Sequence, residues 1–239
     1  MKNKLFIKNA LISVSNKDKI ASFAKNIEQN NINIFSSGGT AKFLKESNVK
    51  VMDVESITDF PEILEGRVKT LHPKIHGGIL ANRKNTNHLN TLNKYKIPEI
   101  DLVVVNLYPF EKIISKESDF DEIIENIDIG GSALIRAAAK NFQNIIVVTQ
   151  INDYQKIINY IKDNTIIPFE FRRTLAKKAF ELTAKYDQII YNWFNKDTVF
   201  PKQMGFVSKK LKELRYGENP HQKAALYSDN SQIKLILNA

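Results

Sequence analysis

Short apolar runs alternate with amphipathic segments along the first 150 residues of the chain. The runs that predict strands cover residues 10–14, 33–36, 49–54, 101–107 and 145–149. Helices are predicted between the strands, over residues 20–27, from residue 37 onward, near residues 119–126 and over residues 132–141. This alternation is typical of a doubly wound α/β domain with a mostly parallel sheet, in which ligands bind beyond the carboxyl ends of the strands.

A long helical pattern follows over residues 168–194. Its apolar stripe consists of Phe171, Leu175, Ala179, Leu182, Tyr186 and Ile189. The stripe predicts a packing helix that covers the sheet or a partner subunit. After Trp193 the pattern ends, and residues 195–210 are interpreted as a linker. The sequence LRYGENPHQ, residues 214–222, and a short predicted strand at 225–227 come next.

The composition excludes several kinds of chemistry. The 239 residues contain no cysteine, so a disulfide framework, a thiolate nucleophile and a cysteine-ligated metal centre are all excluded. The apolar runs are far too short to cross a bilayer, and Asn9 and Ser13 interrupt the apolar stretch that follows the basic N-terminus. We therefore expect a soluble, cytoplasmic protein without a membrane partner.

The net charge of +9 raises the question of a nucleic-acid partner. Of the 35 basic residues, 29 are Lys and only six are Arg, whereas proteins that read base edges favour the planar Arg fork. Asn and Ile are also abundant, as a compositional drift toward Lys, Asn and Ile would produce without any partner. We expect no nucleic-acid binding.

Three segments combine a strand end, small or hydroxyl residues and a helix start. They are SVSNK at 13–17, SSGGT at 36–40 and DIGGS at 128–132. Hydroxyls, glycines and helix N-termini can surround a phosphate. SVSNK also has an ordinary structural explanation as a helix N-cap, and SSGGT as a turn. SSGGT matches neither a P-loop nor a dinucleotide fingerprint.

Two further segments carry polar groups near predicted strand ends. Asn106 and Tyr108 follow the most apolar strand, where they could line a site or cap and pack a turn. The helix after residue 132 carries Arg136 and Lys140, which a spacing of four places on one face. Solvation is the more common fate of such cations.

The stretch EGRVKTLHPKIHGGILANR, residues 65–83, gathers six basic or imidazole side chains around a glycine pair. His72 and His76 lie four residues apart, a spacing that on a helix suits a metal ion. No third ligand follows, and the intervening Pro73 argues against a regular helix across the pair. We interpret these histidines as structural and expect no metal site.

The order and approximate spacing of SVSNK, SGGTA, GRVKTLHP, NLYPF, DIGG and RAAAKN carry a resemblance. Together they resemble the inosine monophosphate (IMP) cyclohydrolase domain of the bifunctional purine biosynthesis enzymes, which also carry aminoimidazole carboxamide ribonucleotide formyltransferase. The resemblance runs from about residue 11 to 194 and resumes at LRYGENPHQ. It implies a three-layer, methylglyoxal-synthase-like α/β fold followed by a C-terminal helical extension.

The resemblance also implies an activity and a set of site residues. The activity is closure of 5-formamidoimidazole-4-carboxamide ribonucleotide to IMP with loss of water, without a metal or an organic cofactor. The implied substrate-binding residues are Ser13, Ser15, Asn16, Lys17, Ser37, Gly38, Gly39, Thr40, Arg67, Val68, Thr70, Asn106, Leu107, Ile129 and Gly130. The implied reacting residues are Lys69, Tyr108, Asp128 and Lys140.

The roles of these four residues follow from the chemistry as hypotheses. Lys69 and Tyr108 would stabilise the charge that develops on the formyl oxygen. Lys140 and Asp128 would transfer protons or position the amide, and clustering with Lys69 and Arg67 would lower the pKa of a lysine that does so. Lys74, His76 and Arg83 are expected to be structural.

The implied domain limits are residues 1–200 for the cyclohydrolase domain and 201–239 for a linker and the start of a formyltransferase domain. The catalytic Lys-His segment of that second domain lies beyond Ala239, so we expect no formyl transfer and no need for 10-formyltetrahydrofolate. The resemblance implies a homodimer. Two alternatives stay open: phosphate elimination of the methylglyoxal synthase type, and a regulatory nucleotide-binding domain of the same fold.

Overall fold

The computed structural model describes residues 6–115, 119–203, 205 and 207–228. The chain divides into two compact parts, Met1–Thr183 and Ala184–Ala239. The long helix α10, Phe169–Phe194, runs across this division.

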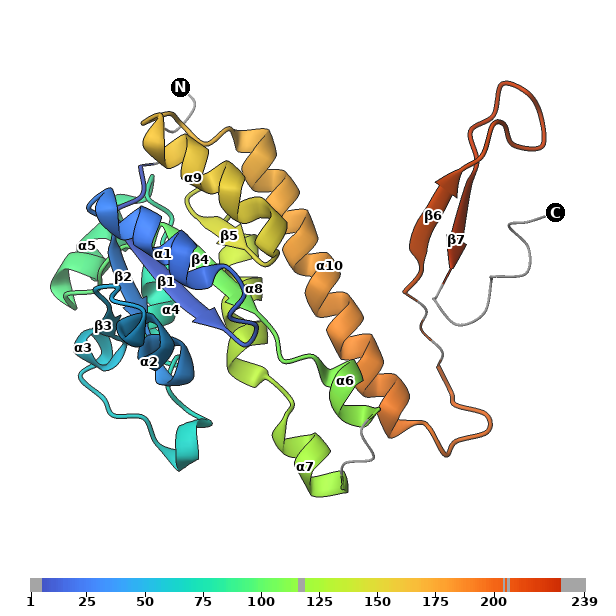
Figure 1. The fold of residues 1–239 in the computed structure, drawn as a ribbon, viewed down its shortest axis with the longest axis horizontal. Helices are drawn as coiled ribbons and strands as arrows, with labels where there is room; N and C mark the ends of the chain where they lie inside the picture. The colour runs from blue at the N-terminus through green and yellow to red at the C-terminus, as the bar shows by residue number, and fades with distance from the viewer. Residues whose placement is uncertain (1–5, 116–118, 204, 206, 229–239) are drawn as a thin grey trace. The chain divides into compact units, whose positions relative to one another are not determined.

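The first part is built on a parallel five-stranded sheet (Figure 1). Its strands are β1 Asn9–Val14, β2 Asn33–Ser36, β3 Met52–Asp53, β4 Leu102–Asn106 and β5 Ile146–Val148, in the order β3-β2-β1-β4-β5. The side chains of β4 from Leu102 to Val105 are buried, as its uninterrupted aliphatic run predicts for a central parallel strand. All five predicted strands are present, and their parallel pairing is confirmed.

The predicted strand at residues 49–54 is wrong in extent, because only Met52 and Asp53 pair with β2. Val49 is buried, but its N–H donates to Leu44 O and so closes the end of helix α2, Gly38–Glu46. Its apolar side chain therefore packs next to the end of a helix, and Val49 does not belong to a strand.

Helices cover both faces of the sheet (Figure 1). Helices α1 Ile20–Gln29, α2 and α9 Tyr154–Lys162 form one layer, while α4 Pro73–Leu80 and α8 Ile129–Lys140 form the other. Shorter elements connect them: α3 Glu55–Thr58, η1 Leu64–Gly66, α5 Thr86–Lys94, α6 Phe110–Ile114, α7 Phe120–Glu125 and η2 Ile151–Asp153. The predicted three-layer α/β architecture is confirmed.

The first half of α10 packs on this part of the chain. Leu175 and Ala179 of the predicted stripe are buried, and so is the neighbouring Ala176. Arg172, only 3% exposed, donates to the backbone oxygens of Phe142 and Gln143, at the turn that follows α8. The predicted packing role of this helix therefore holds for its first half.

The second part contains an antiparallel pair, β6 Lys209–Glu213 and β7 Ala225–Ser228. A tight turn lies between them, in which Gly217 N donates to Gln222 O at 2.8 Å. The predicted linker at residues 195–210 is two residues too long, because β6 begins at Lys209, and the predicted strand at 225–227 is confirmed. Residues 204, 206 and 229–239 of this predicted segment lie outside the described residues. The division at residue 200 stays a prediction.

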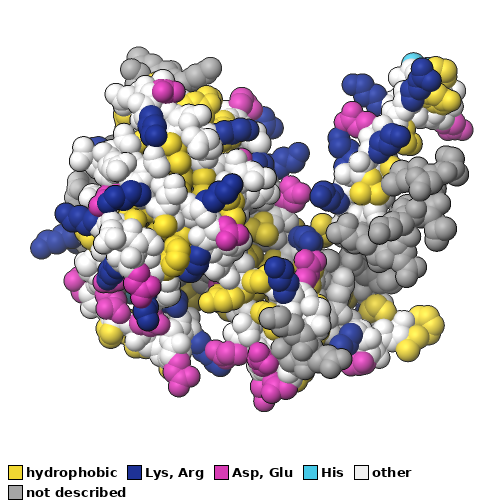
Figure 2. Space-filling view, in the orientation of Figure 1, with side chains coloured by type: hydrophobic (Ala, Val, Ile, Leu, Met, Phe, Trp, Pro, Cys, Tyr) yellow, Lys and Arg dark blue, Asp and Glu magenta, His cyan; other side chains and the backbone are white. Residues whose placement is uncertain are grey.

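Two surface properties bear on partners. Figure 2 shows Lys and Arg side chains dispersed among acidic, apolar and uncharged ones on the face in view. Within the described ranges, no helix combines the length and apolar character needed to cross a membrane.

Candidate active site

The carboxyl edge of the sheet brings together three of the predicted segments. In the parallel register Val14 of β1 lies opposite Asn106 of β4, and Ile12 lies opposite Ser36 of β2. The loops that follow these strands therefore leave the sheet on the same side. This places residues 13–17, residues 36–40 and residues 106–108 next to one another.

Asn106 fixes the loop after β1. Its Oδ1 atom accepts hydrogen bonds from Ser15 N at 2.7 Å and Asn16 N at 2.9 Å, and its Nδ2 donates to Asn16 O at 3.2 Å. The amide thus satisfies backbone groups that a loop at a sheet edge would otherwise leave unpaired. Asn106 acts on the predicted site by holding the Ser15–Asn16 backbone in place.

Thr40 and Lys17 join the first two loops. The Lys17 ammonium donates to Val14 O and, at 3.0 Å, to Thr40 Oγ1. The buried Thr40 hydroxyl donates to Val14 O at 3.0 Å and accepts from Val14 N at 3.1 Å. Burial, and secondly the charge of Lys69, lower the pKa of Lys17.

The start of α2 has the features of an anion site. Gly38 has φ +52°, a conformation that other residues rarely adopt, and Lys69 approaches it closely. A Cβ atom at Gly38 would lie 3.1 Å from Lys69 Nζ. The Ser37 hydroxyl is buried and has no hydrogen-bond partner among the described residues. Free helix N–H groups, a hydroxyl and an ammonium group are therefore adjacent.

Lys69 also reaches the start of α8. Asp128 caps this helix, with Oδ1 accepting from Gly131 N at 2.7 Å. Burial raises the pKa of Asp128, whereas the Gly131 N–H and the charge of Lys69 act in the opposite direction. The buried Thr70 lies against the same helix start, since a Cβ atom at Gly130 would lie 3.3 Å from its hydroxyl. Lys69 thus lies close enough to both Lys17 and Asp128 to influence their pKa values.

Other predicted site residues have different surroundings. Arg67 is exposed, and its guanidinium binds both carboxylate oxygens of Glu125 at the end of α7. Tyr108 and Ile129 are 51% and 62% exposed, respectively. Leu107 is buried, and Val68 forms a backbone bridge with Ile63. Ser13 is half-buried on β1, and Gly39 has open space around it.

The sequence predicts that Lys140 clusters with Lys69 and Arg67. The structure instead places Lys140 at the end of α8 that lies away from Asp128. Lys140 is exposed at the last position of α8, whereas Asp128 caps the first turn. Twelve residues of helix separate the two ends by about 18 Å. Arg136, one turn before Lys140 on α8, is also exposed, and its Cζ atom lies 5.9 Å from the ring centroid of Phe180. The proton-transfer role of Lys140 stays a prediction.

The second half of the cationic stretch makes structural contacts. His72 accepts from Lys74 N at 3.1 Å and caps α4, which begins at Pro73. Arg83 donates to Asp101 Oδ1 at 2.5 Å, beside the amino end of β4. Burial lowers the pKa of His76, and Lys74 pairs with Asp59. The described residues contain no group of three side chains suited to hold a metal ion.

Sequence reasoning missed three side chains at this edge. Glu62 lies 3.8 Å from Lys69 Nζ, Glu125 binds Arg67, and the Ser132 hydroxyl is buried in α8 without a partner among the described residues. Ser132 directly follows the glycine pair of DIGGS, which could have drawn attention to it. The acidic residues lie far from their cations in sequence or outside any motif, so no local pattern identifies them.

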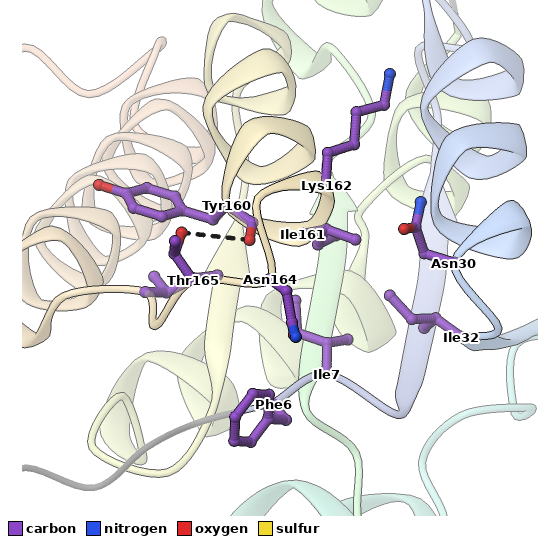
Figure 3. Close-up of a pocket in the computed structure, with 10 residues that line it drawn as sticks. Phe6, Ile7, Asn30, Ile32, Tyr160, Ile161, Lys162, Asn164 and Thr165 are labelled. Carbon is purple, nitrogen blue, oxygen red and sulfur yellow. Dashed lines mark hydrogen bonds between the residues drawn. The ribbon is translucent and has the colours of Figure 1, made fainter.

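A small cavity of about 200 Å³ lies at the opposite, amino edge of the sheet (Figure 3). Its lining includes Ile7 before β1, Ile32 before β2, and Tyr160 and Thr165 at the end of α9. Thr165 donates to Tyr160 O at 3.4 Å. Apolar and amide groups predominate, and none of the predicted site residues lines the cavity.

Two family models match adjoining parts of the chain. A model described as an MGS-like domain matches residues 19–133, and one described as the AICARFT/IMPCHase bienzyme matches residues 138–239. The first covers β2, β4 and most of the candidate site, and the second begins inside α8. Together they span nearly all of the described structure.

Curated relatives agree with the family models. The chain is 50% identical over 222 residues to the "Bifunctional purine biosynthesis protein PurH" of Clostridium perfringens strain SM101, and 50% identical over 224 residues to that of Caldicellulosiruptor saccharolyticus. Each match covers 92% of this chain and 44% of the relative, so the chain spans less than half the length of these relatives.

A solved structure titled "Crystal structure of ForH" is also similar. It has a TM-score of 0.70 and 30% sequence identity, and the match covers 79% of this chain and 98% of that one. The fold, the family models and the sequence identity thus agree, and over 92% of its length the chain is a homologue of the bifunctional purine biosynthesis protein PurH.

Proposed function

We propose that this chain catalyses the last ring closure of purine biosynthesis, in which 5-formamidoimidazole-4-carboxamide ribonucleotide loses water to give IMP. The observation that carries the proposal is the position of Lys69, which lies beside the start of α2 and influences the pKa values of both Lys17 and Asp128. Homology to PurH supports the substrate class.

The reaction requires an electrostatic environment and close positioning. The carboxamide nitrogen attacks the formyl carbon, a C–N bond forms, and the formyl oxygen takes up the electron pair of its double bond. The nitrogen loses a proton and the oxygen gains one. The hydroxyl group then leaves as water, while the former formamido nitrogen gives up its proton and a C=N bond forms. Both reacting groups belong to one molecule, so fixing its conformation removes much of the entropic barrier.

The residues around Lys69 match these needs. The start of α2, with Lys17, Ser37 and Thr40, is proposed to hold the phosphate. Lys69 is proposed to stabilise the charge on the formyl oxygen, together with Tyr108 beyond β4. Asp128 is proposed as a proton carrier, because burial raises its pKa and so favours its protonated form.

A homodimer is part of the proposal and bears on Lys140. Because Lys140 lies about 18 Å along α8 from the Asp128 end, we propose that it acts at a site to which a second copy brings it. Sedimentation of the chain tests the dimer. Full turnover by Lys140→Met would show that Lys140 takes no part in the reaction. A large loss of activity in a dimeric chain would support a role for Lys140 at the partner's site.

The proposal involves no metal, organic cofactor or nucleic acid, because the chemistry asks only for charge stabilisation and proton transfer. Formyl transfer is not proposed for these 239 residues. Absorbance at the wavelength of the closed purine ring tests the function directly. Turnover of the formylated ribonucleotide supports it; nucleotide binding without turnover would support the regulatory alternative, and phosphate release from a triose phosphate would support the methylglyoxal synthase alternative.

A further inference from the structure

The loop between α3 and Lys69 folds back toward the anion site. Ile63 and Val68 form a backbone bridge, and the intervening Leu64, Glu65 and Gly66 all have positive φ values of 53°, 53° and 92°. The conformation is unusual for Leu64, whose side chain is 65% exposed and gains little from packing. Its effect is to bring Glu62, at the start of the loop, opposite Lys69 at its end.

The Glu62 carboxylate lies near the start of α2 and near Lys69. Glu62 Oε1 is 3.8 Å from Lys69 Nζ. A Cβ atom at Gly38 would lie 3.1 Å from Lys69 Nζ and 4.0 Å from Glu62 Oε2. The carboxylate, the ammonium group and the first residue of the helix therefore form one cluster.

The carboxylate is held loosely enough to leave. The Glu62 backbone is fixed, since its N–H donates to Glu55 Oε1 at 3.1 Å, but its side chain is 34% exposed. The ion pair at 3.8 Å is longer than a charge-assisted hydrogen bond of about 2.8 Å. A partly exposed ion pair of this kind is weak, so the Glu62 carboxylate can give way to a phosphate that binds at the start of α2.

We propose that Glu62 is an internal competitor of the substrate phosphate: its carboxylate lies beside Lys69 at the start of α2 in the ligand-free chain and withdraws when a phosphate monoester binds there, which leaves Lys69 to face the formyl oxygen. The inference rests on the proposed function for the identity of the ligand. Its consequence is selective. A singly charged anion binds little better than the Glu62 carboxylate, whereas a doubly charged phosphate monoester displaces the carboxylate.

Binding of inorganic phosphate and of IMP, measured by calorimetry at low salt, tests the proposal. Glu62→Gln is expected to bind phosphate about three- to tenfold more tightly than the unaltered chain, with the gain shrinking as salt screens the charges. Glu46→Gln is the matched control, because it removes one carboxylate from an exposed position at the far end of α2. It is expected to leave the affinity unchanged.

Weaker or unchanged binding by Glu62→Gln would overturn the proposal, as would an equal gain in Glu46→Gln, or no phosphate binding in any variant. If Glu62→Gln does not fold, Glu62→Ala provides the same comparison at this partly exposed position. Binding is independent of turnover. A chain that closes the ring but shows no effect of Glu62 refutes this inference alone, and a chain with the effect but without turnover refutes the proposed function alone.

Discussion

The Lys17 ammonium lies 3.0 Å from the Thr40 hydroxyl, and this hydrogen bond joins the loop after β1 to the first turn of α2. The same hydroxyl accepts from Val14 N, so it also satisfies a buried backbone group. Two segments that look like ordinary helix starts in the sequence are therefore joined by hydrogen bonds. The position of Lys17 depends on a side chain 23 residues away.

Thr40→Val is expected to lower the free energy of unfolding by about 1–3 kcal/mol, because the buried N–H of Val14 loses its acceptor. Urea denaturation measures the change. Thr91→Val is the control, since the Thr91 hydroxyl donates to Asn87 O on the exposed face of α5, and about 0.5 kcal/mol or less is expected there. Equal effects of the two substitutions would argue against a special role of Thr40.

Gly38 and Gly39 are adjacent but are expected to respond in opposite directions to alanine. Gly38→Ala should cost roughly 1–2 kcal/mol, because its left-handed backbone disfavours a Cβ atom and Lys69 Nζ lies 3.1 Å from the place of that atom. Gly39→Ala has open space and a helical backbone, and should be neutral or stabilising by up to about 1 kcal/mol. Thermal unfolding compares them, and a greater loss at Gly39 would contradict the structure.

The ionisation of Asp128 is expected to make stability depend on pH. Because burial raises its pKa, the folded chain binds this proton more tightly than the unfolded chain. The stabilisation is complete below the unfolded pKa and is lost as the pH rises through the folded pKa. Asp128→Asn keeps a capping side chain but cannot ionise. The stability of the unaltered chain minus that of Asp128→Asn should therefore fall as the pH rises, and a difference that grows with pH would contradict this account.

Removing the charge of Lys69 is expected to raise two other pKa values. Its ammonium lowers the pKa of Lys17 by repulsion and that of Asp128 by attraction, so both should rise in Lys69→Met. NMR titration of the two side chains measures this. Lys42→Met, at an exposed position on the same helix as Gly38, serves as the control and should leave both values in place. Unchanged pKa values of Lys17 and Asp128 in Lys69→Met would show that Lys69 does not interact with these two side chains.

The strands were predictable because burial on both faces leaves an uninterrupted aliphatic run, as at residues 102–105. Helix α4 was not predicted. Its start at Pro73 looks like an interruption, yet proline is well suited to the first position of a helix when a side chain such as His72 caps it. Helix α9 was overlooked, although Tyr154, Ile157 and Ile158 show helical spacing and are buried.

The candidate site was predictable only in part. Parallel strands bring their carboxyl ends together, so the neighbourhood of the loops after β1, β2 and β4 follows from the fold class. The ion-pair partners of the cations do not follow from the fold class, since Arg67 and Glu125 are 58 residues apart and meet only through the tertiary structure. The distance of Lys140 from the Lys69 cluster likewise follows from the length of α8, which begins at Ile129 and not at the predicted residue 132.

The central claim, that Lys69 serves ring closure at this edge of the sheet, is tested most directly by the rate of IMP formation from the formylated ribonucleotide in the unaltered chain and in Lys69→Met. We predict turnover by the unaltered chain and a loss of roughly 10²–10³-fold in kcat when the donor to the developing oxyanion is removed. Equal rates in the two proteins, or IMP binding by the unaltered chain without any ring closure, would contradict the account.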